Sequence, residues 1–325
     1  MAEKSYADIK NENELKKLER KVASEYKKAW LEVEKKIKDY YKSFERLEAV
    51  KRKRFENGYI TEEEFNEWRR NKMAIGKRWE TIRDDIVNRM IEADVVASAY
   101  INDTTPNIYS LNANYTAFRV ESYATDISFT LLNERAISNL IQGSNQTTFR
   151  VVNPNRVKSY AWNVEKIQSA LVTGLLLGES VKDIAKRFYK IMGSNWKAAV
   201  RNARTACTSA ACAGRVHTIE KAQEMGIEIE KEWMATADER TRNSHLLMSG
   251  IHVKVDKPFP NGLMYPADPN GEPAEVYNCR CTLVDYLPNI TRKTNTDGKA
   301  FEEWMRRKKK DEDEEARRNR WNEYH

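Results

Sequence analysis

Apolar residues recur every three or four positions from residue 11 to about residue 55, in a segment that is otherwise heavily charged. This spacing places them on one face of a long α-helix. They are Leu15, Leu18, Val22, Tyr26, Trp30, Val33, Ile37 and Tyr40. An Asn-Gly pair at 57–58 ends the pattern, and Thr61-x-x-Glu64 has the form of a capping box. It predicts a second helix, or a kinked pair, that continues toward residue 100.

Two antiparallel helices of this length form a hairpin that cannot bury both apolar faces by itself. The charged segment 1–101 therefore predicts either an isolated coiled coil or a docking arm that packs on another protein.

The pattern becomes mixed after this arm. Residues 102–115 are polar and contain a proline, so we expect a loop and a first domain boundary there. Residues 116–141 predict a helix, and residues 149–153 predict a short β-like piece.

Three further helices are expected over 162–177, 181–192 and 196–225, with Gly178-Glu179-Ser180 separating the first two and Gly226 closing the third. The third helix is rich in small residues, which allows a neighbouring element to approach closely. We assign residues 116–226 to a helical domain.

Residues 227–288 have a different pattern. Alternating apolar positions predict strands over 227–233, 251–255 and 276–284. A second capping box, Thr236-x-x-Glu239, predicts a helix that ends at Gly250. This segment reads as a small α+β module. The predicted fold is mainly α, with a long N-terminal helical hairpin and this C-terminal module.

Residues 289–325 form a charged tail in which a basic block, 306–310, adjoins an acidic one. It predicts either a frayed helix or a peptide hook for a partner.

Composition narrows the function classes. Charged residues make up 32% of the chain and the net charge is +7, but the excess is spread along the sequence, so a dedicated nucleic-acid stripe is not indicated. No apolar run is long enough to span a membrane, and the N-terminus lacks the apolar core of a signal peptide. The four cysteines do not form the pattern of a secreted disulfide framework. We expect a protein made and kept in a cytoplasm.

Candidate chemistry lies between Trp233 and Cys281. On the predicted helix, Asp238, Arg242 and His245 share one face. On the predicted last strand, Cys279 and Cys281 share a face, with Asn278 and Arg280 on the other. In so small a module, His245 is expected to meet the two thiols.

Three readings of these residues remain open. In the favoured one the cysteines are small buried apolar groups, and His245 caps a helix or bridges a carboxylate. Arg240 and Arg242 then pair with acidic residues or backbone carbonyls and hold the long loop. In the second, His245, Cys279 and Cys281 bind a structural zinc ion, with Asp238, His252 or water as the fourth ligand. In the third, a zinc-bound water is catalytic.

Other catalytic patterns are absent from the sequence. The spacing does not match that of zinc deaminases, because no glutamate follows His245 at the required place and no Pro-Cys-x-x-Cys is present. There is no Gly-rich phosphate loop and no nucleophile elbow.

The pattern resembles the phage head morphogenesis family, the minor capsid proteins related to the Mu F protein and the SPP1 minor head protein. The residues that carry the resemblance are Trp233, Asp238-x-Arg240-x-Arg242-x-x-His245, Gly250, Phe259-Pro260-x-Gly262, Pro266 and Asn278-Cys279-Arg280-Cys281. Preceding residues are also similar, namely Gly178-Glu179-Ser180, Arg204-Thr205 and Gly214-Arg215. The similarity covers about 155–288. One departure is Thr205-Ala206-Cys207, where many relatives carry Thr-Glu.

The resemblance implies a non-enzymatic virion protein, present in few copies, that associates with the portal during procapsid assembly. It implies double-stranded DNA binding without sequence preference, a role in DNA packaging or ejection, and scaffold and major capsid proteins as further partners. The location implied is the capsid interior near the portal, after assembly in the host cytoplasm. Some relatives carry a toxin domain after this module, but here a short charged tail follows, so we expect no toxin activity. The alternative is a zinc-dependent hydrolase or nuclease carried in the virion.

Overall fold

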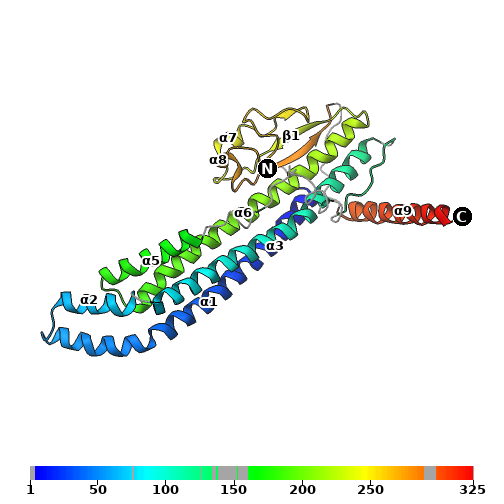
Figure 1. The fold of residues 1–325 in the computed structure, drawn as a ribbon. Coiled ribbons are helices and arrows are strands. Elements are labelled where there is room, and N and C mark those ends of the chain that lie inside the picture. The colour runs from blue at the N-terminus through cyan, green and yellow to red at the C-terminus, as the bar shows by residue number, and fades with distance from the viewer. Residues whose placement is uncertain are drawn as a thin grey trace. The chain divides into compact units, whose positions relative to one another are not determined.

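The computed structural model describes residues 4–74, 77–124, 126–133, 137, 152, 160–288 and 298–324. Long helices dominate it, and a small antiparallel sheet lies in the C-terminal region (Figure 1). The elements are α1 (Tyr6–Glu56), α2 (Glu62–Met73), α3 (Lys77–Tyr123), α5 (Tyr160–Leu176), α6 (Val181–Glu224), β1 (Glu230–Met234), α7 (Asn243–Leu246), β2 (His252–Val253), α8 (Pro273–Val276), β3 (Thr282–Tyr286) and α9 (Gly298–Tyr324). The predicted fold class is confirmed. None of the helices within the described residues is long and apolar enough to cross a membrane.

The chain divides into two compact units. The sheet-containing unit comprises 1–18, 101–152 and 201–325, and the helical unit comprises 19–100 and 153–200. Helices α1, α3 and α6 contribute residues to both. The four segments predicted from the sequence do not coincide with these two units. The assignment of each segment to a separate domain stays a prediction.

In the helical unit, α1 and α2 are joined as the sequence predicts. The Thr61 side chain accepts a hydrogen bond from the Glu64 amide at 3.1 Å, and the Glu64 carboxylate accepts one from the Thr61 amide at 2.9 Å, which completes the capping box. Helix α5 packs against α2 (Figure 1), and the Trp79 indole of α3 donates to Gln168 of α5 at 2.8 Å.

In the sheet-containing unit the strand order is β2-β1-β3, with Lys231 opposite Val253 and Glu232 opposite Val284. The sheet lies beside the C-terminal half of α6 (Figure 1). Helix α9 buries Phe301, whose ring lies 5.3 Å from that of Tyr115 in α3. The predicted tail is therefore a helix whose first turns belong to the core of this unit.

The loop predicted over 102–115 was wrong, because these residues lie within α3, which contains Pro106. Asn112 and Thr116 are at most 2% exposed and donate to the carbonyls of Ile108 and Asn112, at 2.7 and 2.9 Å. Polar side chains that hydrogen-bond their own helix and pack inside the unit override the turn signal. The helix predicted over 116–141 ends at Tyr123, and 126–133 is not helical. Apart from Val152, the piece at 149–153 lies outside the described residues.

The predicted break between 192 and 196 was also wrong, since α6 is continuous. The Asn195 amide there is buried and donates to Asp94 at 3.3 Å, so a residue typical of turns is held by a tertiary contact.

The helix predicted from Thr236 to Gly250 is reduced to the single turn of α7. The Thr236 hydroxyl donates to the Arg280 carbonyl at 2.6 Å instead of capping a helix. The last strand begins at Thr282, not at 276, so both cysteines precede it.

Candidate functional site

His245, Cys279 and Cys281 lie together in the sheet-containing unit. The His245 Nδ1 atom is 3.5 Å from the Cys279 sulfur and 3.4 Å from the Cys281 sulfur. The exposed fractions are 1%, 1% and 3%, respectively. The expected meeting of the histidine with both thiols therefore occurs, although through loops and one helical turn, not through a helix face and a strand face.

A carboxylate lies on the other side of the imidazole. The Glu275 Oε2 atom is 2.9 Å from His245 Nε2, in a contact bent away from ideal hydrogen-bond geometry. The Ser244 hydroxyl donates to both Glu275 oxygens, at 3.0 and 3.2 Å. The Arg242 guanidinium donates to the Tyr277 carbonyl at 2.5 Å and so ties α7 to α8. The sequence analysis missed Glu275, because nothing in its spacing marks it as a partner of His245.

Helix α6 holds the turn that carries the cysteines. Asn278 has a φ of 58°, a left-handed conformation that asparagine tolerates better than most residues. Its amide donates to the Thr205 hydroxyl at 3.1 Å, and the Thr208 hydroxyl donates to the Cys279 carbonyl at 2.9 Å. Thr205 thus supports the cysteine turn through its own hydroxyl. This contact does not involve residue 206, where the sequence departs from many relatives.

The other predicted site residues lie around the cluster. The Asp238 carboxylate accepts two hydrogen bonds from the Arg280 guanidinium, one of them at 2.6 Å, which hold its pKa below the usual range. The exposed Arg240 contributes its backbone amide, which donates to Asp238 at 3.0 Å. The ring of the buried Trp233 lies edge-on to that of His245, with centroids 5.2 Å apart.

Neither predicted fourth ligand belongs to the cluster found among the described residues. Asp238 is occupied by Arg280. The exposed His252 ring contacts the Glu230 carboxylate at 2.5 Å and stacks on Tyr286, with ring centroids 3.8 Å apart.

The two thiols differ in acidity. The hydrogen bond with Cys279, helped by His245, lowers the pKa of the Cys281 thiol to about 5. The same hydrogen bond, together with burial, raises the pKa of Cys279. One shared hydrogen bond thus shifts the two pKa values in opposite directions.

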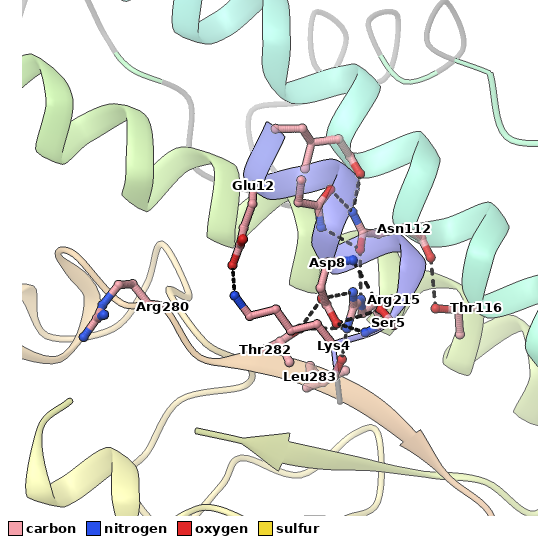
Figure 2. Close-up of polar contacts among 12 residues, drawn as sticks. Lys4, Ser5, Asp8, Glu12, Asn112, Thr116, Arg215, Arg280, Thr282 and Leu283 are labelled. Carbon is pink, nitrogen blue, oxygen red and sulfur yellow. Dashed lines mark hydrogen bonds and ion pairs between the residues drawn. The ribbon is translucent and has the colours of Figure 1, made fainter. Parts of the chain in front are cut away.

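A buried arginine, Arg215, joins several elements of the sheet-containing unit (Figure 2). The Arg215 guanidinium of α6 donates to Asn112 in α3 at 2.9 Å and to Asp8 in α1 at 2.6 Å. It also donates to the Thr282 hydroxyl at 2.7 Å and the Leu283 carbonyl at 2.6 Å in β3. Burial acts to raise the pKa of Asp8, but Arg215 and Ser5 hold it below its ordinary value. One side chain thus connects three helices to the sheet.

Lys231, on β1, has a fully buried side chain that donates to the Val255 carbonyl at 2.8 Å and lies over the Phe259 ring. Burial lowers its pKa from 10.5 to about 8, although Glu220, Asp256 and Asp268 act in the opposite direction.

Between pH 8 and 10.5 the unfolded chain therefore binds more protons at Lys231 than the folded chain does. We expect this residue to make the free energy of unfolding rise by about 1–3 kcal/mol over that interval. The difference between wild type and Lys231→Met in urea unfolding at several pH values measures this rise. The exposed Lys254→Met is the control, and equal curves for wild type and Lys231→Met would contradict the expectation.

The region that contains the cluster is similar to known proteins. Residues 165–284 match the family described as Phage Mu protein F like protein. The chain is 26% identical over 251 residues to Minor head protein GP7 of Bacillus phage SPP1, covering 69% of this chain and 77% of that protein. It is 32% identical over 156 residues to NAD(+)–arginine ADP-ribosyltransferase EFV of Enterococcus faecalis (strain ATCC 700802 / V583).

That second match covers 43% of this chain but only 31% of the transferase, so the chain spans about a third of that protein's length. No solved structure matches the chain. The matched region contains the histidine–cysteine cluster and Arg215, together with the motif residues that carry the resemblance. These findings confirm the resemblance to phage head morphogenesis proteins, and the match to the family model covers residues 165–284.

Proposed function

We propose that this chain is a minor head protein of a tailed phage, which associates with the portal protein during procapsid assembly and takes part in DNA packaging or ejection. The observation that carries the proposal is the similarity to the SPP1 minor head protein over 77% of that protein's length. We place it in the capsid interior near the portal, with assembly in the host cytoplasm and with scaffold and major capsid proteins as further partners.

Exposed apolar side chains of the helical unit support a docking role. Leu47 and Val50 of α1 and Tyr59 in the α1–α2 turn are 53%, 61% and 73% exposed. We call these three residues the hairpin tip. Large apolar side chains that are exposed to solvent can contribute to contacts with a partner. An open groove of about 410 Å³ lies between α2 and α5 of the same unit, and the 67% exposed Leu176 is one of its lining residues.

The triple variant Leu47→Ser/Val50→Ser/Tyr59→Ser is expected to lose portal binding. Each large apolar side chain buried at an interface contributes about 1.5–3 kcal/mol, so three losses predict at least about a hundredfold weaker association. Co-purification of the full chain with the portal protein of the same phage, quantified by a binding titration, measures the loss.

The matched control is Met225→Ser/Leu246→Ser/Leu247→Ser, which changes three apolar residues of the sheet-containing unit that are 45%, 40% and 74% exposed. This control should bind as wild type does. Full binding by the tip variant would show that the arm does not dock. Substitution is preferable to deletion of 1–100, because deletion removes Asp8, which pairs with Arg215.

We also propose binding of double-stranded DNA without sequence preference. The net charge of +7 and four exposed basic residues on α9 support it, since lysine and arginine side chains bind phosphates and release counterions. They are Arg306, Arg307, Lys309 and Lys310.

We infer a non-enzymatic role. The zinc-hydrolase alternative needs a metal-bound water that a substrate can reach, whereas the side chains of the cluster are at most 3% exposed. The ADP-ribosyltransferase activity belongs to a protein of which this chain spans about a third.

A further inference from the structure

We propose that His245, Cys279 and Cys281 bind one zinc ion, which cross-links the loop around α7 to the cysteine turn and fixes the fold of the sheet-containing unit. The inference rests on the local arrangement of these side chains. It holds or fails independently of the role in phage assembly.

The spacing of the donor atoms fits tetrahedral zinc. With zinc–sulfur bonds of about 2.3 Å and zinc–nitrogen bonds of about 2.0–2.1 Å, a tetrahedral angle separates the nitrogen and sulfur by about 3.5–3.6 Å. The two distances from His245 Nδ1 are 3.5 Å to Cys279 and 3.4 Å to Cys281. All three donor atoms lie within 4.8 Å of one another. One ion can therefore contact all of them without rearrangement of the backbone.

The imidazole is oriented as a ligand. The Glu275 carboxylate lies 2.9 Å from Nε2, and Nδ1 faces the two sulfurs. A histidine that binds zinc commonly has a carboxylate beyond its other nitrogen.

Both sulfurs also accept backbone hydrogen bonds. Cys281 receives a backbone hydrogen bond from Thr236, and Cys279 receives one from Cys281. Two soft sulfur ligands and one imidazole are a donor set that selects zinc over magnesium or calcium.

The ion would have a structural role. Because Asp238 and His252 are held elsewhere, water would complete the tetrahedron. The near-complete burial of the three ligand side chains prevents a substrate from approaching it. The ligands come from two loop segments that share no strand pairing, so coordination supplies a connection that the three-stranded sheet does not.

The test begins with metal analysis of the purified full chain, followed by removal with a chelator and addition of cobalt(II). We expect about one zinc per chain, and a cobalt–thiolate absorption band after exchange, because metal affinity requires all three deprotonated ligands. His245→Ala and Cys279→Ser/Cys281→Ser should reduce the zinc content at least about tenfold. The controls His252→Ala and Cys207→Ser, which change the same residue types outside the cluster, should keep it.

Far-UV circular dichroism shows whether each variant is folded. If a cluster variant does not fold, the proposal is tested by the cobalt titration of the wild-type chain from which the chelator has removed the metal. Zinc below about a tenth of an ion per chain, together with no cobalt–thiolate band, overturns the proposal.

Discussion

Replacement of Arg215 by methionine is expected to lower the free energy of unfolding of the sheet-containing unit by about 3–5 kcal/mol, because it leaves the partner carboxylate without its counter-charge. Asp8 has a side chain 21% exposed, and Arg215 one that is 4% exposed. Methionine keeps much of the volume, so the loss comes from the unpaired polar groups and not from a cavity. Urea unfolding followed by circular dichroism and tryptophan fluorescence gives the change.

Two further variants separate this effect from a general effect of arginine removal. Arg201→Met, at an exposed position of the same helix, removes only a contact with the Tyr277 ring and should change stability by less than about 1 kcal/mol. The double variant Asp8→Asn/Arg215→Met removes both charges and should be more stable than Arg215→Met alone. An Arg215→Met chain as stable as wild type would show that the network does not hold the helices to β3.

Features that depend on nearby residues could be predicted from the sequence. Helix α1 follows from apolar spacing alone, and the capping box at Thr61 involves only residues three positions apart. The same reasoning failed at Thr236, where an identical signature has a different role. Its hydroxyl donates to the carbonyl of Arg280, which lies 44 residues away.

The sequence predicted which residues of the candidate site meet, but not the secondary structure that brings them together. His245 meets Cys279 and Cys281 because the module is small, although the assumed helix and strand are not there. Glu275 and Thr205 hold the cluster through contacts with distant segments, and only a fold can show such contacts. Thr205 and Arg215 were marked by resemblance alone. Their roles became clear once α3, α6 and β3 were placed together.

The second large change in stability is expected at Gly214, which lies where α6 crosses α3 within the sheet-containing unit. A Cβ atom at this position would be 2.4 Å from the Tyr109 carbonyl oxygen and 3.2 Å from the Ala113 amide nitrogen. Both neighbours are backbone atoms of a helix and cannot rotate away as a side chain would. The two helices must therefore move apart. This movement disrupts the hydrogen bond from Arg215 of α6 to Asn112 of α3.

We expect Gly214→Ala to lower the free energy of unfolding by about 2–3 kcal/mol, although alanine in a helix interior is otherwise favoured over glycine by about 0.5–1 kcal/mol. Gly193→Ala is the matched control. It lies on the same helix, and its Cβ would meet nothing within 4 Å, so this variant should be stabilised by the intrinsic helix preference. The two identical substitutions are thus predicted to have opposite signs in urea unfolding. If Gly214→Ala is also stabilised, α3 and α6 can move apart without a loss of stability. The Arg215 network would then not depend on their close contact.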